Sequence, residues 1–266
     1  MDLRHIVAAT DESDAGRRAL LAALALGRRV MGRVTVMRVI SPGSSLGSPE
    51  LALEELRRWL EAEGVRTCSD GDVRVAVSYG VPSVEICRFA ERQGAGLLVL
   101  GRKPRSSMAR MLVGDTADAV ARRSQVPCLF VPPRGVSWQR VVAAVDGTER
   151  GMAVLLAASD LSRTVGAELR AVTVERHRDE EPAELASSIP SLRAGRLRPR
   201  VAQAGADLEV RLGDPVEQIV ATAERAEADV LMVGYHRGGP PGILEAGSTA
   251  RRLVHTAPCA VVTIPL

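Results

Sequence analysis

Two short stretches of the chain place an aspartate directly after an apolar run and a hydroxyl residue two positions later. The first stretch, IVAATDES, contains Asp11 and Ser13, and the second, VVAAVDGT, contains Asp146 and Thr148. An aspartate at this point can hold a turn through its side-chain oxygen, and Ser13 or Thr148 is the expected N-cap of the helix that follows. The same carboxylate can instead lie beside the base or ribose of a nucleotide. Both interpretations of Asp11 and Asp146 stay open at this level.

A second group of candidate residues follows a later apolar run, where Gly234 precedes a segment that ends in Gly247-Ser248-Thr249. A glycine before a helix lets the backbone approach a ligand closely, and the free amides of the first turn form an anion site with the Ser and Thr hydroxyls. The plain alternative is a serine-capped helix whose glycine makes the turn. In the first half of the chain Gly101 and Gly114 stand at the corresponding places, but Asp115 follows Gly114.

The residue patterns typical of disulfides, metal sites and common catalytic motifs are largely missing from the sequence. The four cysteines form no CxxC pair and the four histidines no HxxxH or HExxH pattern, so neither a disulfide nor a metal site is expected. Cys128 and Cys259 each follow a proline at the start of an apolar run and are expected to be buried. A Walker loop, an SGGxDS loop and an HxGH motif are all absent. For slow ATP hydrolysis only Asp146 and His236 are candidates, and His236 is otherwise read as an exposed loop residue.

The composition indicates a globular protein with a core of small aliphatic residues. Hydrophobic residues make up 46% of the chain and aromatic residues only 2%, which suits parallel strands buried on both faces. No apolar run reaches the roughly 18 to 20 residues of a membrane span, and the start lacks the pattern of a signal peptide. We therefore expect a cytoplasmic protein without membrane contact. The basic residues are scattered without interleaved aromatics, so nucleic-acid binding is not expected either.

The two halves of the chain repeat one another. Asp11 matches Asp146 at an offset of 135, and Gly80 and Gly101 match Gly213 and Gly234 at an offset of 133. The stretches GDT and GST, and then VPCLFVPP and APCAVVTIP, continue the match in the same order. Anchors in one order at nearly one offset indicate a duplication. The sequence predicts two domains, residues 1–133 and 137–266, with Pro132 to Gly135 as the linker.

Each copy is predicted to alternate strands with helices. Strands are expected at 3–9, 33–40, 72–78, 96–101 and 127–132, and again at 139–145, 168–174, 207–212, 229–234 and 259–264. Helices are expected at 14–30, 49–63, 83–93 and 115–124, and again at 149–165, 182–203, 215–226 and 248–256. A continuous helix in the segment 176–204 would be broken at least once by Pro182, Pro190 and Pro199, so a shortened or split helix plus loops is expected there. The pattern predicts an α/β protein of two tandem doubly wound domains, each a five-stranded parallel sheet with helices on both faces and its ligand crevice at the carboxyl ends of the strands.

On these residues the repeating unit resembles a universal stress protein domain, and the resemblance spans essentially the whole chain twice. The ATP-binding branch of that family carries G-x2-G-x9-G-[S/T] after the fourth strand and an aspartate at the end of the first. In the second copy Gly234 and Gly247-Ser248 match at the right spacing, while Arg237 replaces the middle glycine and Gly238 follows it. In the first copy Gly101 and Gly114 match, while Pro104 and Asp115 depart from the motif.

The resemblance implies an adenine nucleotide alpha hydrolase-like fold and a regulatory role in the stress response. It implies ATP as the ligand, leaves open whether Mg²⁺ accompanies it, and adds no metal site of the protein's own. The aspartate would lie by the adenine and ribose, the valine that ends the second strand would offer backbone contacts to the base, and the glycine-rich loop would hold ribose and phosphates. Carried over, the site in domain 2 comprises Asp146, Val174, Gly234, Arg237, Gly238, Gly247, Ser248 and Thr249, and the weaker site in domain 1 comprises Asp11, Val39, Gly101 and Gly114.

Electrostatics ranks the two predicted sites. Asp115 and Asp118 are expected in the first turn of a helix, where a carboxylate satisfies the helix dipole and repels a phosphate. Ser248 and Thr249 leave the equivalent turn of domain 2 open, and Arg237, Arg251 and Arg252 add positive charge there. Domain 2 is therefore predicted to bind nucleotide if either domain does. The alternative is an interaction module of the same fold that binds no nucleotide, and no enzyme beyond a slow ATPase is expected.

The resemblance also implies a partner other than nucleotide. Domains of that family usually pair through their last strands, so the two copies are expected to form a pseudo-dimer within one chain. Whether the chain then forms a homodimer stays open.

Overall fold

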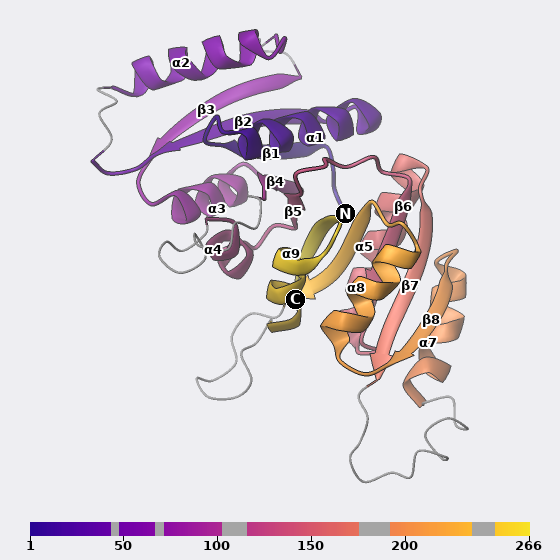
Figure 1. Ribbon diagram of the computed structural model, residues 1–266. Coiled ribbons are helices and arrows are strands. Elements are labelled where there is room, and N and C mark those ends of the chain that lie inside the picture. Colours follow the sequence, from indigo (N-terminus) through magenta and orange to yellow (C-terminus); the bar gives the residue numbers. More distant parts are fainter. Residues whose placement is uncertain (44–47, 67–71, 103–115, 176–191, 236–247) are drawn as a thin grey trace. The chain divides into compact units, whose positions relative to one another are not determined.

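The computed structural model describes residues 1–43, 48–66, 72–102, 116–175, 192–235 and 248–266 (Figure 1). The chain divides into two compact units, unit 1 from Met1 to Val136 and unit 2 from Ser137 to Leu266. Among the described residues, no helix has both the length and the apolar character that crossing a membrane requires.

In the described part of unit 1, strands and helices alternate from the start. The order is β1 (His5–Thr10), α1 (Asp14–Val30), β2 (Arg33–Ile40), α2 (Pro49–Ala62), β3 (Val73–Tyr79), α3 (Pro82–Arg92), β4 (Leu97–Gly101), α4 (Thr116–Arg123) and β5 (Cys128–Val131). Unit 2 repeats this order with β6 (Arg140–Ala144), α5 (Glu149–Val165), β7 (Glu168–Glu175), α7 (Leu192–Gln203), β8 (Asp207–Leu212), α8 (Pro215–Arg225), β9 (Val230–Tyr235), α9 (Ser248–Thr256) and β10 (Ala260–Pro265).

Both units have the same sheet topology. The strand order is β3-β2-β1-β4-β5 in unit 1 and β8-β7-β6-β9-β10 in unit 2, and every pair within a unit is parallel. Right-handed crossovers then put α1 and α2 on one face, because both connections run in the same direction, and α3 and α4 on the other. Figure 1 shows this layering in unit 1, and α3 packs against α4 as α8 does against α9. The predicted doubly wound fold is confirmed in both copies.

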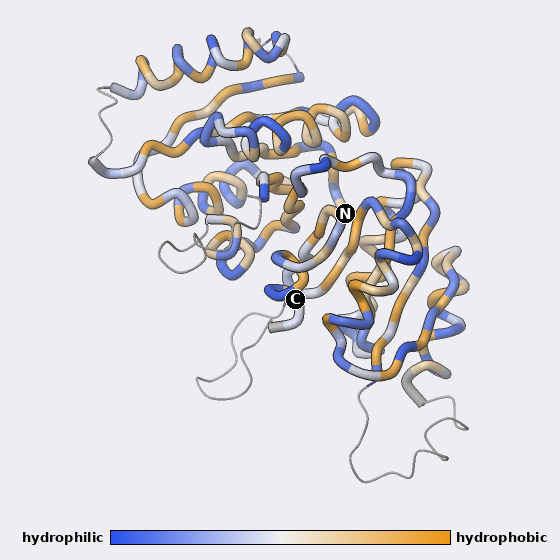
Figure 2. Tube along the Cα trace, viewed as in Figure 1, coloured by the Kyte–Doolittle hydropathy of each residue, from blue (hydrophilic) through white to orange (hydrophobic). Residues whose placement is uncertain are grey.

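The core of each unit is aliphatic, as the composition predicts. All six residues of β1 are buried, because a central parallel strand is covered on both faces, and all four residues of β5 are buried as well. Alanines give α1 a narrow buried side that lies close to β1 and β4. Figure 2 shows the apolar strands as orange segments inside the bluer helices.

The element boundaries agree closely with the prediction. The helices at 14–30, 149–165 and 248–256 begin and end where expected. The predicted helix at 182–203 is described only as α7, and its first ten residues lie outside the described part of the chain. A shortened or split helix was expected in this segment, and α7 is shorter than the predicted helix; it runs through Pro199, while Pro182 and Pro190 lie outside the described residues. Proline removes one helical hydrogen bond, but Ala194, Leu197 and Val201 are buried on either side of it and hold the helix to its unit.

Candidate functional site

The two aspartates that follow the first strands make the same turn in both units. Thr148 donates to Asp146 Oδ1 from its backbone N–H at 3.0 Å and from its hydroxyl at 2.6 Å. Ser13 donates to Asp11 Oδ1 in the same two ways, with its N–H at 3.2 Å. One carboxylate oxygen of each aspartate therefore serves the turn, as the structural interpretation predicts. Both aspartates are exposed at the carboxyl edge of their sheets. The other interpretation, a carboxylate beside the base or ribose of a nucleotide, requires the same location.

The predicted N-caps are confirmed. Ser13 accepts a hydrogen bond from the N–H of Gly16, and Thr148 accepts one from Gly151. A side chain at Gly16 would clash with Thr10 Oγ1, and one at Gly151 would clash with Asp146 Oδ1. These glycines let the first helix start against the aspartate turn. Sequence reasoning did not single them out, although both stand at the same place in the repeated stretches TDESDAG and VDGTERG.

The predicted valines lie at the same sheet edge as the aspartates. Val39 is the last residue but one of β2, and Val174 is the last but one of β7, each strand lying beside the first strand of its unit. Both side chains are half-buried. The structure thus brings Asp11 near Val39, and Asp146 near Val174, as two neighbouring strand ends.

The glycines at the ends of the fourth strands are required by packing. Gly101 ends β4, and a side chain there would clash with the backbone carbonyl of Ala15 in α1. At Gly234 in β9 a side chain would clash with Leu266 and approach Val154 of α5 to 3.2 Å. Both glycines therefore have a structural role whether or not a ligand is bound.

The helices after these strands differ in charge. The first turn of α4 contains Asp118, which is 7% exposed and pairs with Arg122 at 2.5 Å. The first turn of α9 contains no acidic residue. Arg251 stands where unit 1 has Asp118, at the repeat offset of 133. Thr249 is half-buried near the start of α9. Gly114, Asp115, Arg237, Gly238 and Gly247 lie outside the described residues.

Arg252 has a partner of its own. Its guanidinium lies 3.4 Å from Asp214, the N-cap of α8. The backbone N–H of Glu217 lowers the pKa of Asp214 most, with Arg252 and Val216 adding to the effect against the burial of the carboxyl. The charge of Arg252 is thus shared with Asp214. Within the first turns themselves, the two helices differ by having Arg251 in α9 and Asp118 in α4.

The cysteines and the other side chains that could bind a metal ion were compared with the expectation from the sequence. Cys128, the first residue of β5, and Cys259, directly before β10, are buried, as predicted. Across the described ranges no cluster of three or more His, Cys, Asp or Glu side chains is placed to hold a metal ion. The arrangement offers carboxylate, backbone amide and hydroxyl groups to a ligand.

Comparison with known proteins matches both units to one family. A sequence profile of the universal stress protein family matches residues 2–132 and again residues 137–265. A universal stress protein of Methanocaldococcus jannaschii is 26% identical over 144 residues, which are 48% of this chain and 81% of that protein. One from Mycobacterium tuberculosis is 24% identical over 230 residues, 79% of this chain and 77% of the relative.

Solved structures agree on the fold. The crystal structure of a universal stress protein from Archaeoglobus fulgidus superposes with a TM-score of 0.74 at 20% identity, covering 100% of this chain and 99% of that one. At this identity the likeness concerns the fold alone. With the profile match over both units, the resemblance predicted from the sequence is confirmed: the chain belongs to the universal stress protein family, with two of its domains in tandem.

Proposed function

We propose that the protein is a nucleotide-binding regulatory protein of the stress response, with ATP bound by unit 2 and unit 1 serving as its structural partner. The proposed site in unit 2 is formed by Asp146 and Val174 at one end and by Gly234, Ser248 and Thr249 at the other. Arg237, Gly238 and Gly247 complete it from the segment between β9 and α9. Mg²⁺ would enter with the nucleotide.

The charge of the first helical turn carries this proposal. A helix N-terminus attracts an anion, and a carboxylate in that turn already takes up the favourable field, an effect of about 0.3–1 kcal/mol. In α4 the carboxylate of Asp118 is buried in that turn and paired with Arg122. Arg251 takes the position of Asp118 in α9. The first turn of α9 therefore favours a phosphate, and that of α4 disfavours one.

Equilibrium titration with ATP and Mg²⁺ tests the proposal, with a matched pair of substitutions. Asp146→Ala removes the proposed contact to base or ribose, and Asp11→Ala makes the same change in unit 1. Both break the same turn, so they disturb the folds alike. Loss of one charged hydrogen bond is worth roughly 1.5–3 kcal/mol. We expect Asp146→Ala to weaken ATP binding about tenfold or more and Asp11→Ala to leave it unchanged.

Gly247→Asp provides a second test at the phosphate end. It puts an acidic residue directly before α9 in the sequence, as Asp115 directly precedes α4. Saturable binding in the wild type that is lost in this variant supports the proposal. No binding to the wild type at millimolar ATP rejects it in favour of an interaction module that binds no nucleotide. Equal loss on Asp11→Ala and Asp146→Ala would reject the assignment to unit 2.

A further inference from the structure

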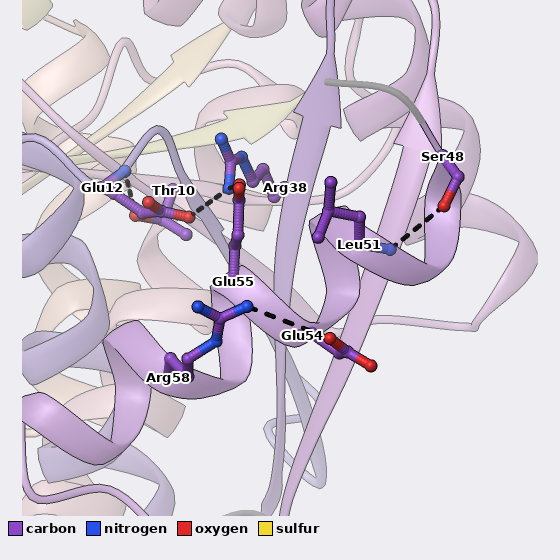
Figure 3. Close-up of polar contacts among 8 residues, drawn as sticks. All are labelled: Thr10, Glu12, Arg38, Ser48, Leu51, Glu54, Glu55 and Arg58. Carbon is purple, nitrogen blue, oxygen red and sulfur yellow. Dashed lines mark hydrogen bonds and ion pairs between the residues drawn. The ribbon is translucent and has the colours of Figure 1, made fainter. Parts of the chain in front are cut away.

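An ion-pair bridge joins three elements of unit 1 at the carboxyl edge of its sheet. The Arg38 guanidinium in β2 lies 2.7 Å from the Glu12 carboxylate, in the turn after β1, and 3.3 Å from that of Glu55 in α2 (Figure 3). The Arg38 side chain is 17% exposed and that of Glu12 is 24% exposed. Both charges are therefore largely withdrawn from water and satisfied by one another.

The backbone of unit 1 is adapted to this bridge. Glu12 has a φ of 58°, in the left-handed region that a side chain makes unfavourable by about 1–2 kcal/mol. Its N–H donates to Thr10 Oγ1 at 2.9 Å, and its carboxylate is held by Arg38. These two contacts offset the strain and fix the residue next to Asp11.

Unit 2 has different residues at the positions of Thr10, Glu12 and Arg38. Val145 stands at the position of Thr10, Gly147 at that of Glu12 and Thr173 at that of Arg38, all at the offset of 135. Gly147 adopts the same left-handed turn with a φ of 75°, where glycine carries no strain. None of the three replacements is charged, so the bridge cannot form in unit 2.

The bridge lies where a ligand of this fold would enter. Arg38 is in register with Thr10, the last residue of β1, and Glu12 follows two positions later. In doubly wound sheets ligands bind at the carboxyl ends of the strands. A nucleoside bound over the ends of β1 and β2 would meet this ion pair, and separating the partners would leave buried charges without their compensation.

We infer that the Glu12–Arg38–Glu55 bridge closes the carboxyl edge of β1 and β2 in unit 1, and that Glu12 and Arg38 are the residues that exclude a nucleoside from this unit. The class of ligand rests on the proposed function. The closure is separate from the repulsion of phosphate by Asp118, because it acts at the other end of the site. A nucleoside without phosphates therefore isolates it.

Counting adenosine sites per chain by equilibrium dialysis tests the inference. The variant combines Glu12→Gly with Arg38→Thr, which gives unit 1 the residues of unit 2. The matched control combines Glu54→Gln with Arg58→Thr, which removes an exposed pair at 3.9 Å on α2 (Figure 3). We expect the variant to bind one more adenosine per chain than the wild type, and the control to bind the same number as the wild type.

The expected gain of one adenosine site in the variant does not depend on whether unit 2 binds adenosine. A wild type with one site and a variant with two support both proposals, while a count of none and then one supports the closure and rejects the proposed function. An equal count in wild type and variant overturns the closure in either case. If far-UV circular dichroism shows that the double variant is unfolded, Glu12→Gly alone decides by the same count. It leaves the Arg38–Glu55 pair in place and removes the strained side chain.

Discussion

His5 ties the stability of unit 1 to pH through a single buried imidazole. The side chain lies at the amino end of β1 with an exposure of 6%. Its Nδ1 is 3.1 Å from the carbonyl of Gln93, and Nε2 is 2.9 Å from Thr35 Oγ1. Burial lowers the pKa of His5; the Gln93 carbonyl opposes this, and the charges of Arg33 and Arg74 add to the lowering. The neutral imidazole is therefore the form that the fold accepts.

This arrangement predicts a loss of stability in mild acid. The unfolded chain takes up the proton first, at a pKa of about 6.5, so the contribution of His5 is complete above that pH and is lost as the pH falls through the folded pKa. One proton gives a slope of at most about 1.4 kcal/mol per pH unit. Urea unfolding at pH 7.5, 6.5 and 5.5 should show a flatter dependence in His5→Gln. His255→Gln, which replaces a half-buried histidine of α9, is the control. Equal slopes for His5→Gln and the wild type would contradict the prediction.

At the scale of elements, repeat-equivalent helices start with different caps. Both α3 and α8 begin with a proline, which suits the first helical position. Asp214 caps α8 by accepting from the N–H groups of Val216 and Glu217 at 3.0 and 3.1 Å. Val81 stands before α3 without a side-chain hydrogen bond and is 56% exposed. The amides at the start of α3 therefore lack the acceptor that α8 has.

Exchanging these two residues should shift stability in opposite directions. Val81→Asp supplies the missing cap, loses little apolar burial and should raise the free energy of unfolding by about 1 kcal/mol. Asp214→Val should lower it by about 1 kcal/mol or more, because Arg252 also loses its partner. Urea denaturation at pH 7 measures both changes. A destabilised Val81→Asp variant would contradict the role assigned to the cap.

At the scale of the whole molecule, the duplication has given two units with one scaffold and different charges at their sheet edges. Unit 1 holds Asp118 in its last helix and the Glu12–Arg38–Glu55 bridge at its first turn. Unit 2 has Arg251, Gly147 and Thr173 at the equivalent positions. Differences at both ends of the proposed site point the same way, toward one nucleotide per chain.

Hydrogen exchange with ATP should reveal this inequality within one sample. At 100 times the dissociation constant, ATP stabilises the unit that binds it by about 2.7 kcal/mol. Exchange should slow in residues 146–151 and in α9, while residues 11–16 and α4 keep their rates and serve as the internal control. Equal protection of both units would reject the assignment of the site to unit 2.

Much of this architecture could be predicted from local patterns. Short Val- and Leu-rich runs, Ser13 and Thr148 as caps and the repeated anchors led to the two doubly wound units, because each signal acts over a few residues. The location of Asp146 and Val174 at one edge of the sheet could also be predicted, because the carboxyl ends of parallel strands lie at the same edge. The course of α7 through Pro199 could not, because buried contacts on both sides of the proline hold the helix.

The sequence by itself determined the duplication, the family and the positions of the candidate binding residues along each strand. These depend on periodicity and on the order of motifs along the chain. Only the tertiary structure decided which charges meet. Arg38 is 26 positions from Glu12 and 17 from Glu55, and no local pattern pairs them. Their bridge depends on β2 lying beside β1 and on α2, packed against β3, bringing Glu55 to Arg38. The close approach of α1 that requires Gly16 and Gly101 was decided in the same way, because steric contacts between elements exist only once the sheet is assembled.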